Sequence, residues 1–145
     1  RRVLEGRGHT VAVTSVARGA VTASDGTSVP VNVAIKDVKT YDYDAFVFIG
    51  GEGAAMYFDD QQVRKLATDV KWKTIGATGN AAIILALAEA LKDKKATAPA
   101  NSAHWLVRNG AVFTGRPLEV DGKVVTLQDP SATEQFANAI AKAME

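Results

Sequence analysis

A run of 21 residues, 71–91, constrains the fold more than any other part of the chain. It begins with a short, mostly apolar segment that suits one buried strand. Gly79 and Asn80 interrupt that segment, and the residues after them are strong helix formers with almost no polar side chain. The sequence therefore predicts a strand–elbow–helix unit from Thr74 to Leu91, with the first N–H groups of the helix facing the turn. In α/β enzymes built this way the turn residue is a nucleophile, and here it is Gly79.

Strand and helix signals alternate on both sides of this unit. Residues 45–49 are a continuous apolar run, which is typical of a central parallel strand. Two Asp-Gly pairs, Asp25-Gly26 and Asp121-Gly122, lie between apolar runs and predict small hairpins. Further strands are predicted at residues 9–15, 94–99 and 111–114, and helices at 61–70, 102–108 and from a capping box at 131–134 to Met144. Together these elements predict an α/β sandwich with a mostly parallel sheet.

Length and charge limit the classes of function. A chain of 145 residues suits one domain, and its net charge of +1 argues against nucleic acid as the main partner. There is no cysteine, and the two histidines lack metal-ligand spacing, so we expect neither a metal nor a cofactor. No apolar run reaches the roughly 18 residues of a membrane helix, so we expect a cytoplasmic location without membrane contact.

The start of the chain resembles the end of a helix rather than the beginning of a domain. Residues 1–8 end in glycine, as a helix C-terminus does, and no initiator Met precedes them. We therefore expect one N-terminally incomplete domain over residues 1–145, with the first strand missing. That strand would lie beside residues 46–49, because a parallel sheet without an inner strand leaves backbone groups unpaired.

The order of several short motifs resembles the ThiJ/PfpI superfamily, relatives of class I glutamine amidotransferases. These motifs cover nearly the whole chain and include residues 8–11, 43–45, 50–51, 91–97, 109–112, 120–126 and 134–136, together with the elbow. The resemblance implies a flavodoxin-like fold and homodimers or higher homo-oligomers. It also implies small-molecule or peptide substrates and the family's activities: glyoxalase or deglycase, peptidase or amidase, chaperone and stress-response functions.

Two departures from the family pattern bear on catalysis. Aligned with the family, the nucleophilic cysteine falls on Gly79, and a frequent histidine falls on Asn80. The family's glutamate, which hydrogen-bonds that cysteine, would fall upstream of Arg1. Gly79 is then a lost nucleophile position; the alternative is an ordinary helix-start glycine. The sequence predicts a catalytically impaired family member, a pseudoenzyme, unless the native protein carries a cysteine at this position.

Other residues are weaker candidates for the site. Gly50 and Gly51 follow a predicted strand and are oxyanion N–H candidates, although a plain turn is equally consistent. Asn80 is expected to cap the helix, with its N–H as a further oxyanion candidate. Glu52 and His104 are minor acid–base candidates, each more typical of a solvated loop or a structural role. Trp72 and Trp105 are expected to be packing or interface residues, and His9 a structural residue. Asp59-Asp60 is expected to be a charged pair at a helix start, and Gln128-Asp129-Pro130 a loop that lines the cleft.

The competing interpretation is a non-catalytic binding, chaperone or regulatory domain. The segment at residues 19–27 is similar to the flavodoxin-like C-terminal domains of large catalases. A flavin site is disfavoured, because no Ser/Thr-rich phosphate loop follows an N-terminal strand.

Overall fold

The computed structural model describes residues 38–50 and 60–144, together with short strands between residues 14 and 34. The predictions for residues 1–8, His9, Gly51, Glu52 and Asp59 lie outside the described residues.

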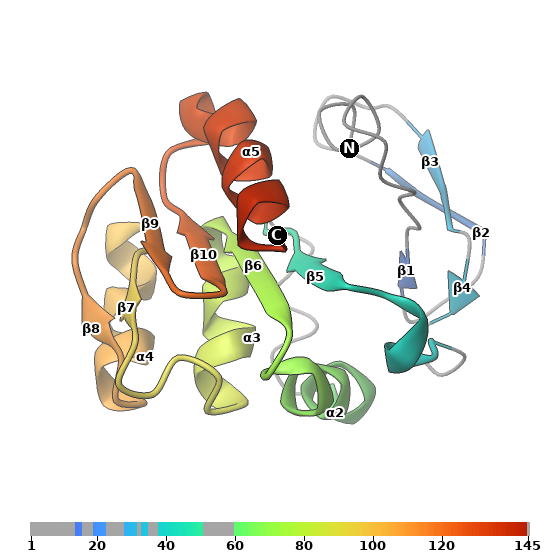
Figure 1. Cartoon of the computed structure of the whole chain (residues 1–145), viewed down its shortest axis with the longest axis horizontal. Coiled ribbons are helices and arrows are strands. Elements are labelled where there is room, and N and C mark those ends of the chain that lie inside the picture. Colours follow the sequence, from blue (N-terminus) through green and yellow to red (C-terminus); the bar gives the residue numbers. More distant parts are fainter. Residues whose placement is uncertain are drawn as a thin grey trace.

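A four-stranded sheet forms the centre of the described part (Figure 1). Its order is β5 (Ala45–Phe48), β6 (Thr74–Thr78), β10 (Val124–Leu127) and β9 (Leu118–Asp121). The first three strands are parallel, and β9 pairs antiparallel with β10. The predicted α/β fold with a mostly parallel sheet is confirmed.

Three smaller strand pairs accompany this sheet: β1 (Thr14–Ser15) with β4 (Val33–Ala34), β2 (Gly19–Thr22) with β3 (Ser28–Val31), and β7 (Lys95–Ala96) with β8 (Val112–Phe113). Antiparallel pairing of β2 with β3 confirms the first predicted hairpin, although its turn is not described. In the second hairpin Asp121 pairs with Val124, so the loop is Gly122-Lys123. Gly122 has φ +61°, the left-handed conformation that such a two-residue turn requires.

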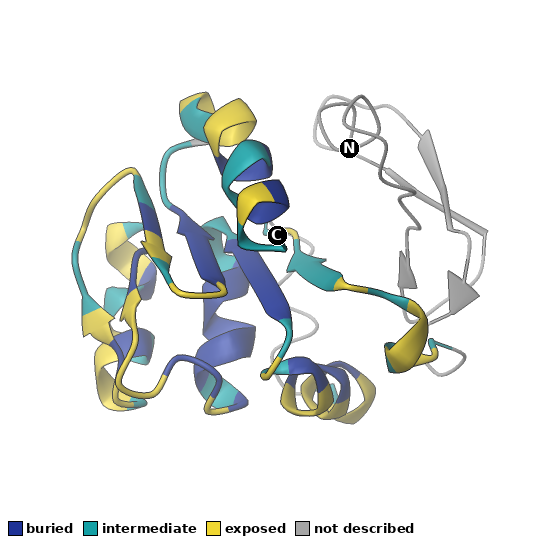
Figure 2. Cartoon of the chain, in the orientation of Figure 1, coloured by how far each residue is buried: buried dark blue, intermediate teal, exposed yellow. Residues whose placement is uncertain are grey.

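Helices cover both faces of the central sheet, and its two inner strands, β6 and β10, are largely buried between them (Figure 2). On one face, β6 and β10 pack with α2 (Gln61–Val70), α3 (Ala82–Leu87) and α4 (Ala103–Arg108) through a core that includes Ile75, Leu85 and Leu106. On the other face, Val125 packs against α5 (Thr133–Ala143). Strand residues alternate between these cores, as the two-residue period of a strand requires. None of the described helices is long and apolar enough to cross a membrane.

The helix after the elbow is shorter than the predicted 81–91. Helix α3 ends at Leu87, because Glu89 adopts a left-handed conformation with φ +61°. The N–H of Ala90 donates to Leu85 O at 2.9 Å and that of Glu89 to Ala86 O at 3.1 Å, which is a Schellman ending. Glycine usually occupies the left-handed position, so a glutamate there gave no stop signal in the sequence.

The start of α5 also differs from the prediction. The expected capping box is wrong, since the N-cap is Ala132 and no side chain caps it. The Ser131 N–H instead donates to Asp129 Oδ1 at 2.9 Å. Hydrogen bonds from the Ser131 N–H and then its hydroxyl hold the pKa of Asp129 below its ordinary value. Their stabilisation is present above the unfolded-state pKa and is lost as the pH falls through the folded-state value.

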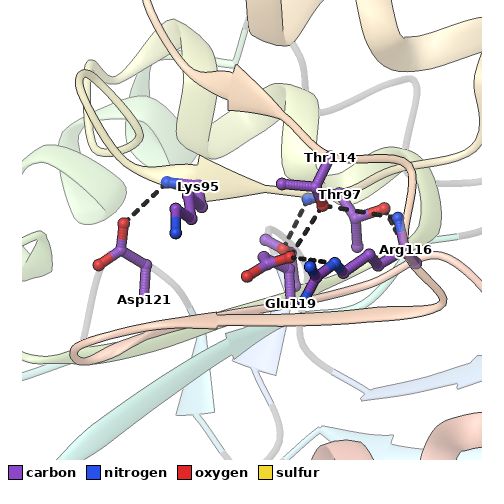
Figure 3. Close-up of polar contacts among 7 residues, drawn as sticks. Lys95, Thr97, Thr114, Arg116, Glu119 and Asp121 are labelled. Atoms are coloured by element: carbon purple, nitrogen blue, oxygen red, sulfur yellow. Dashed lines mark hydrogen bonds and ion pairs between the residues drawn. The ribbon is translucent and has the colours of Figure 1, made fainter.

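Side chains, rather than a backbone ladder, join β7 to the β9–β10 hairpin (Figure 3). Asp121 Oδ2 accepts the Lys95 N–H at 2.8 Å, and Thr126 Oγ1 accepts the Thr97 N–H at 2.8 Å. The Thr97 hydroxyl donates to Arg116 O at 2.6 Å. These bonds satisfy N–H groups at the edge of β7, and they show that β7 runs in the same direction as β10.

A methyl group on Gly76 should destabilise the sandwich. An ideal Cβ there would lie 2.6 Å from Ile140 Cδ1 and 2.9 Å from Phe136 Cζ, both in the core beneath α5. We expect Gly76→Ala to lower the free energy of unfolding by about 1–3 kcal/mol. Ile140→Val removes the clashing Cδ1 atom, so the double variant should lose less stability than the sum of the two single variants. Denaturant unfolding of all four proteins measures this coupling, and strictly additive losses would contradict it.

Candidate functional site

The carboxyl ends of β5, β6 and β10 meet at one edge of the sheet, where ligands bind in open α/β folds. In the parallel register Phe48 pairs with Ala77, and Thr78 pairs with Leu127. Gly50 and Gly79 therefore follow neighbouring strands at this edge, and Gln128 follows the third. The predicted elbow and the predicted glycine loop are adjacent in space.

Gly79 makes the turn out of β6. It has φ +55° and begins a 3₁₀ turn, Gly79–Ala81, that continues into α3. Among the described residues, a Cβ at this position would meet one heavy atom within 4 Å, the Gly50 Cα at 4.0 Å. These residues leave room for a side chain, whereas the backbone angle favours glycine. The geometry is that of an elbow without a side chain at its apex.

Gly50 lies in close contact with the backbone of this elbow. A Cβ on Gly50 would collide with the Thr78 carbonyl oxygen and lie 3.0 Å from the Asn80 nitrogen. The Gly50 N–H donates to Thr78 Oγ1 at 2.9 Å. Glycine is therefore required by close approach, and the hydrogen bond joins the end of β5 to the elbow.

The hydrogen bond bears on the role expected for Gly50. Its N–H donates to the Thr78 hydroxyl in this structure and would have to leave that bond to serve an oxyanion, so the oxyanion role stays a prediction. Thr78 was not among the residues selected from the sequence. The sequence marks Thr78 as a site residue only by its hydroxyl group immediately before the turn, and threonine is an ordinary residue in a strand.

Asn80 lies inside the 3₁₀ turn and does not cap the helix as predicted. The N-cap residue of α3 is Ala81, and no side-chain hydrogen bond caps that helix or the 3₁₀ turn before it. The Asn80 side chain instead approaches the β5 end, with its Oδ1 atom 2.8 Å from the point where a Gly50 Cβ would be.

Gln128 forms hydrogen bonds to two other segments beside the elbow. Its Nε2 donates to Ala98 O at 3.0 Å, and its backbone N–H donates to Pro117 O at 2.8 Å. The loop after β10 thus holds the segment after β7 at the same edge of the sheet. This places the predicted loop next to the elbow, while its contact with a ligand stays a prediction.

His104 lies on α4 with an exposed side chain. Its ring is 5.3 Å from that of Trp105, at a tilt of 39°. Ser102 is buried, and its hydroxyl bonds to Asn101 Oδ1 at 3.3 Å. Trp105 packs against the core, whereas Trp72 is 81% exposed. These contacts favour structural roles for Ser102, His104 and Trp105.

Carboxylates in the described part have structural roles or lie apart. Asp60 caps α2 by accepting the Gln62 and Val63 N–H groups at 2.9 and 3.1 Å. Within residues 38–50 and 60–144, no three His, Cys, Asp or Glu side chains are grouped closely enough to hold a metal ion. The edge of the sheet can therefore offer backbone groups, the Thr78 hydroxyl and a space beside Gly79.

The chain matches most of the length of several longer proteins. An uncharacterized protein of Methanocaldococcus jannaschii is 34% identical over 148 residues, covering 99% of this chain and 72% of the relative. A protein of Pyrococcus furiosus named Deglycase PfpI is 26% identical over 129 residues, covering 88% of this chain and 78% of its own length. The crystal structure of a ThiJ/PfpI domain protein from Brachyspira murdochii superposes with a TM-score of 0.93 at 24% identity, over 99% of this chain and 84% of that one.

A family model also matches almost the full length of the chain. The model described as the DJ-1/PfpI family matches residues 1–143. With this match, the chain belongs to the DJ-1/PfpI family.

Proposed function

We propose that this domain is a catalytically impaired member of its family that retains the elbow as a binding site for small molecules or peptides. One observation carries the proposal: Gly79 stands at the apex of the turn with φ +55°, and among the described residues only Gly50 Cα, at 4.0 Å, lies within 4 Å of an ideal Cβ there. The 145 residues contain no cysteine. Thiol-dependent hydrolysis or deglycation needs a thiolate as the attacking group, so this sequence cannot perform that step.

The structure supports binding at this edge through its rigidity. The Gly50–Thr78 and Gln128–Ala98 hydrogen bonds hold three segments around the elbow. A preformed site loses less conformational entropy when a ligand binds. The relative named Deglycase PfpI suggests carbonyl compounds and their adducts as the first ligands to test.

Oligomerisation, a stress-response role and a cytoplasmic location stay predictions. We propose a homodimer or higher homo-oligomer, as the family resemblance implies. Sedimentation at micromolar concentration should show a species of at least twice the 15.3 kDa chain mass. A monomer at every concentration would rule out self-association.

The proposed function predicts ligand binding without turnover. We expect no hydrolysis of glyoxal-type or peptide substrates above the buffer rate, because the thiol nucleophile is absent. The amide NMR signals of Gly50 and Gly79 should nevertheless shift when a small carbonyl compound is added. Turnover well above the buffer rate, abolished by His104→Gln or Glu52→Gln, would overturn the proposal and identify a different catalytic group. Absence of any shift would reject the binding site.

Restoring a thiol at the elbow tests the assignment of Gly79. In Gly79→Cys the free N–H groups at the start of α3 should favour the thiolate and lower the thiol pKa below about 8.5. The left-handed backbone should make the substitution cost on the order of 1–3 kcal/mol. We expect a reactive thiol, measured as the pH dependence of alkylation by mass spectrometry.

The hairpin provides a matched control in Gly122→Cys. Gly122 has φ +61°, and no heavy atom of the described residues lies within 4 Å of an ideal Cβ there, so the two positions share the backbone strain and the open surroundings, but Gly122 does not precede a helix. The parent chain has no other cysteine, so each variant has a single thiol. Equal alkylation midpoints in the two variants would mean that Gly79 is an ordinary turn residue.

A further inference from the structure

Lysines gather at the edge of the sheet opposite the elbow, where the parallel strands begin. Lys71 and Lys73 precede β6, and Lys123 precedes β10 in the hairpin turn. The Ile75 N–H donates to Lys123 O at 2.9 Å, which joins the two connections. We call this surface the basic edge and define it by the lysines of the segments around these strand starts: Lys39, Lys71, Lys73, Lys92, Lys94, Lys95, Lys123 and Lys142.

The topology places the other members of this set at the same edge. β7 runs in the direction of β10, so Lys92 and Lys94 lie before a strand start as well. The end of α5 reaches β6, where the Thr74 hydroxyl donates to Ala143 O at 3.2 Å, so Lys142 also lies here. Lys39 lies on the segment that leads into β5.

The carboxylates at this edge are fewer, and some are engaged. Asp121 accepts the Lys95 N–H, and Asp69 forms an ion pair with Lys65 at 3.8 Å. The others are Asp42, Asp44, Glu89 and Asp93. At the opposite edge, Asp60, Asp129 and Glu134 lie at helix starts, with Arg116 nearby. Among the described residues, the basic edge thus has eight lysines and six carboxylates, whereas the opposite edge has these three carboxylates and Arg116.

Helix dipoles explain only a small part of this division. Bases near helix C-termini are favourable, but only Arg108 of α4 and Lys142 of α5 occupy a last helical turn. Lys71 is the C-cap residue of α2, and Lys73 Nζ donates to Tyr43 O at 2.9 Å, so these two lysines also have local roles in the fold. Lys39, Lys92, Lys94 and Lys123 lie in the connections before strands. Such a local excess of one sign attracts partners of the opposite sign.

Two exposed aromatic side chains accompany the lysines. Trp72 is 81% exposed and Tyr41 is 75% exposed, on the connections that enter β6 and β5. These strands are neighbours, with Ala45 paired to Thr74. Lys71 Nζ lies 5.4 Å from the Trp72 ring centroid, a cation–π arrangement. Large exposed aromatics beside positive charges are typical of the anchors of protein interfaces.

We propose that the basic edge is a docking surface for an acidic segment of a partner protein, with Trp72 and Tyr41 as its apolar anchors. Charge complementarity carries the choice of partner. Two copies of this chain would bring lysines against lysines, which disfavours self-pairing through this edge. Asp42, Asp44 and Asp93 interrupt the row of positive charge, which suits discrete carboxylates better than a continuous phosphate backbone.

The experiment uses a short labelled peptide rich in Glu with interspersed Leu, and fluorescence anisotropy as the readout. We expect the peptide to bind at low salt, to weaken as salt is added, and to lose binding when Gln replaces Glu. Lys71→Gln with Lys123→Gln should weaken binding by about tenfold, or about 1.4 kcal/mol. Trp72→Ser should weaken it as well while leaving the salt dependence unchanged, because it removes apolar contact and no charge.

A matched pair of variants controls for net charge. Arg64→Gln with Arg116→Gln removes the same charge from the exposed side of α2 and from the opposite edge, and should leave binding unchanged. Absence of peptide binding to the parent protein at low salt overturns the proposal, as does an equal loss in both double variants. Tighter binding of oligouridylate or of phosphatidylserine vesicles than of the peptide would overturn it in favour of a nucleic acid or a membrane surface.

Discussion

The close approach of Gly50 to the backbone of the elbow is the contact on which the candidate site depends. With a hydrogen atom in place of a side chain, the end of β5 can reach the Thr78 carbonyl and the Asn80 nitrogen. The Thr78 hydroxyl then receives the Gly50 N–H, and the ends of two neighbouring strands act as one backbone unit. Any larger residue at position 50 would separate them, since backbone atoms cannot move aside as a flexible side chain can.

Under the proposed function, this backbone unit would keep the shape of the site when a nucleophile is absent. The shape of the elbow is held by Gly50, Thr78 and the left-handed angle of Gly79, none of which is a reacting group. Loss of a thiol would therefore remove chemistry without removing the space that a ligand occupies. The proposed binding role follows from this separation of shape and reactivity.

The rest of the sandwich supports this edge through two kinds of connection. Backbone ladders align β5, β6 and β10, so their carboxyl ends meet. Side-chain hydrogen bonds from Asp121, Thr126 and Gln128 attach the segment around β7 without a ladder. The same parallel arrangement gathers the strand starts at the opposite edge, where the lysines lie far from the elbow. One topology thus produces two surfaces of different chemistry.

Local sequence determined the elements that depend on neighbouring residues. The apolar runs at 45–49 and 74–78 and the two hairpins follow from periodicity and turn chemistry, and they were predicted correctly. The early end of α3 at Glu89 and the uncapped start of α5 were missed, because competing hydrogen bonds in the folded chain decided them.

Within the site, sequence alone selected Gly79, Gly50 and Asn80, but it could not say what each contacts. The Gly50–Thr78 bond spans 28 positions, and the Gln128–Ala98 bond spans 30. Likewise, the lysines of the basic edge come from five separate segments between Lys39 and Lys142. Only the parallel register of the sheet brings them to one edge, because pairing between distant strands depends on tertiary packing rather than on any local signal.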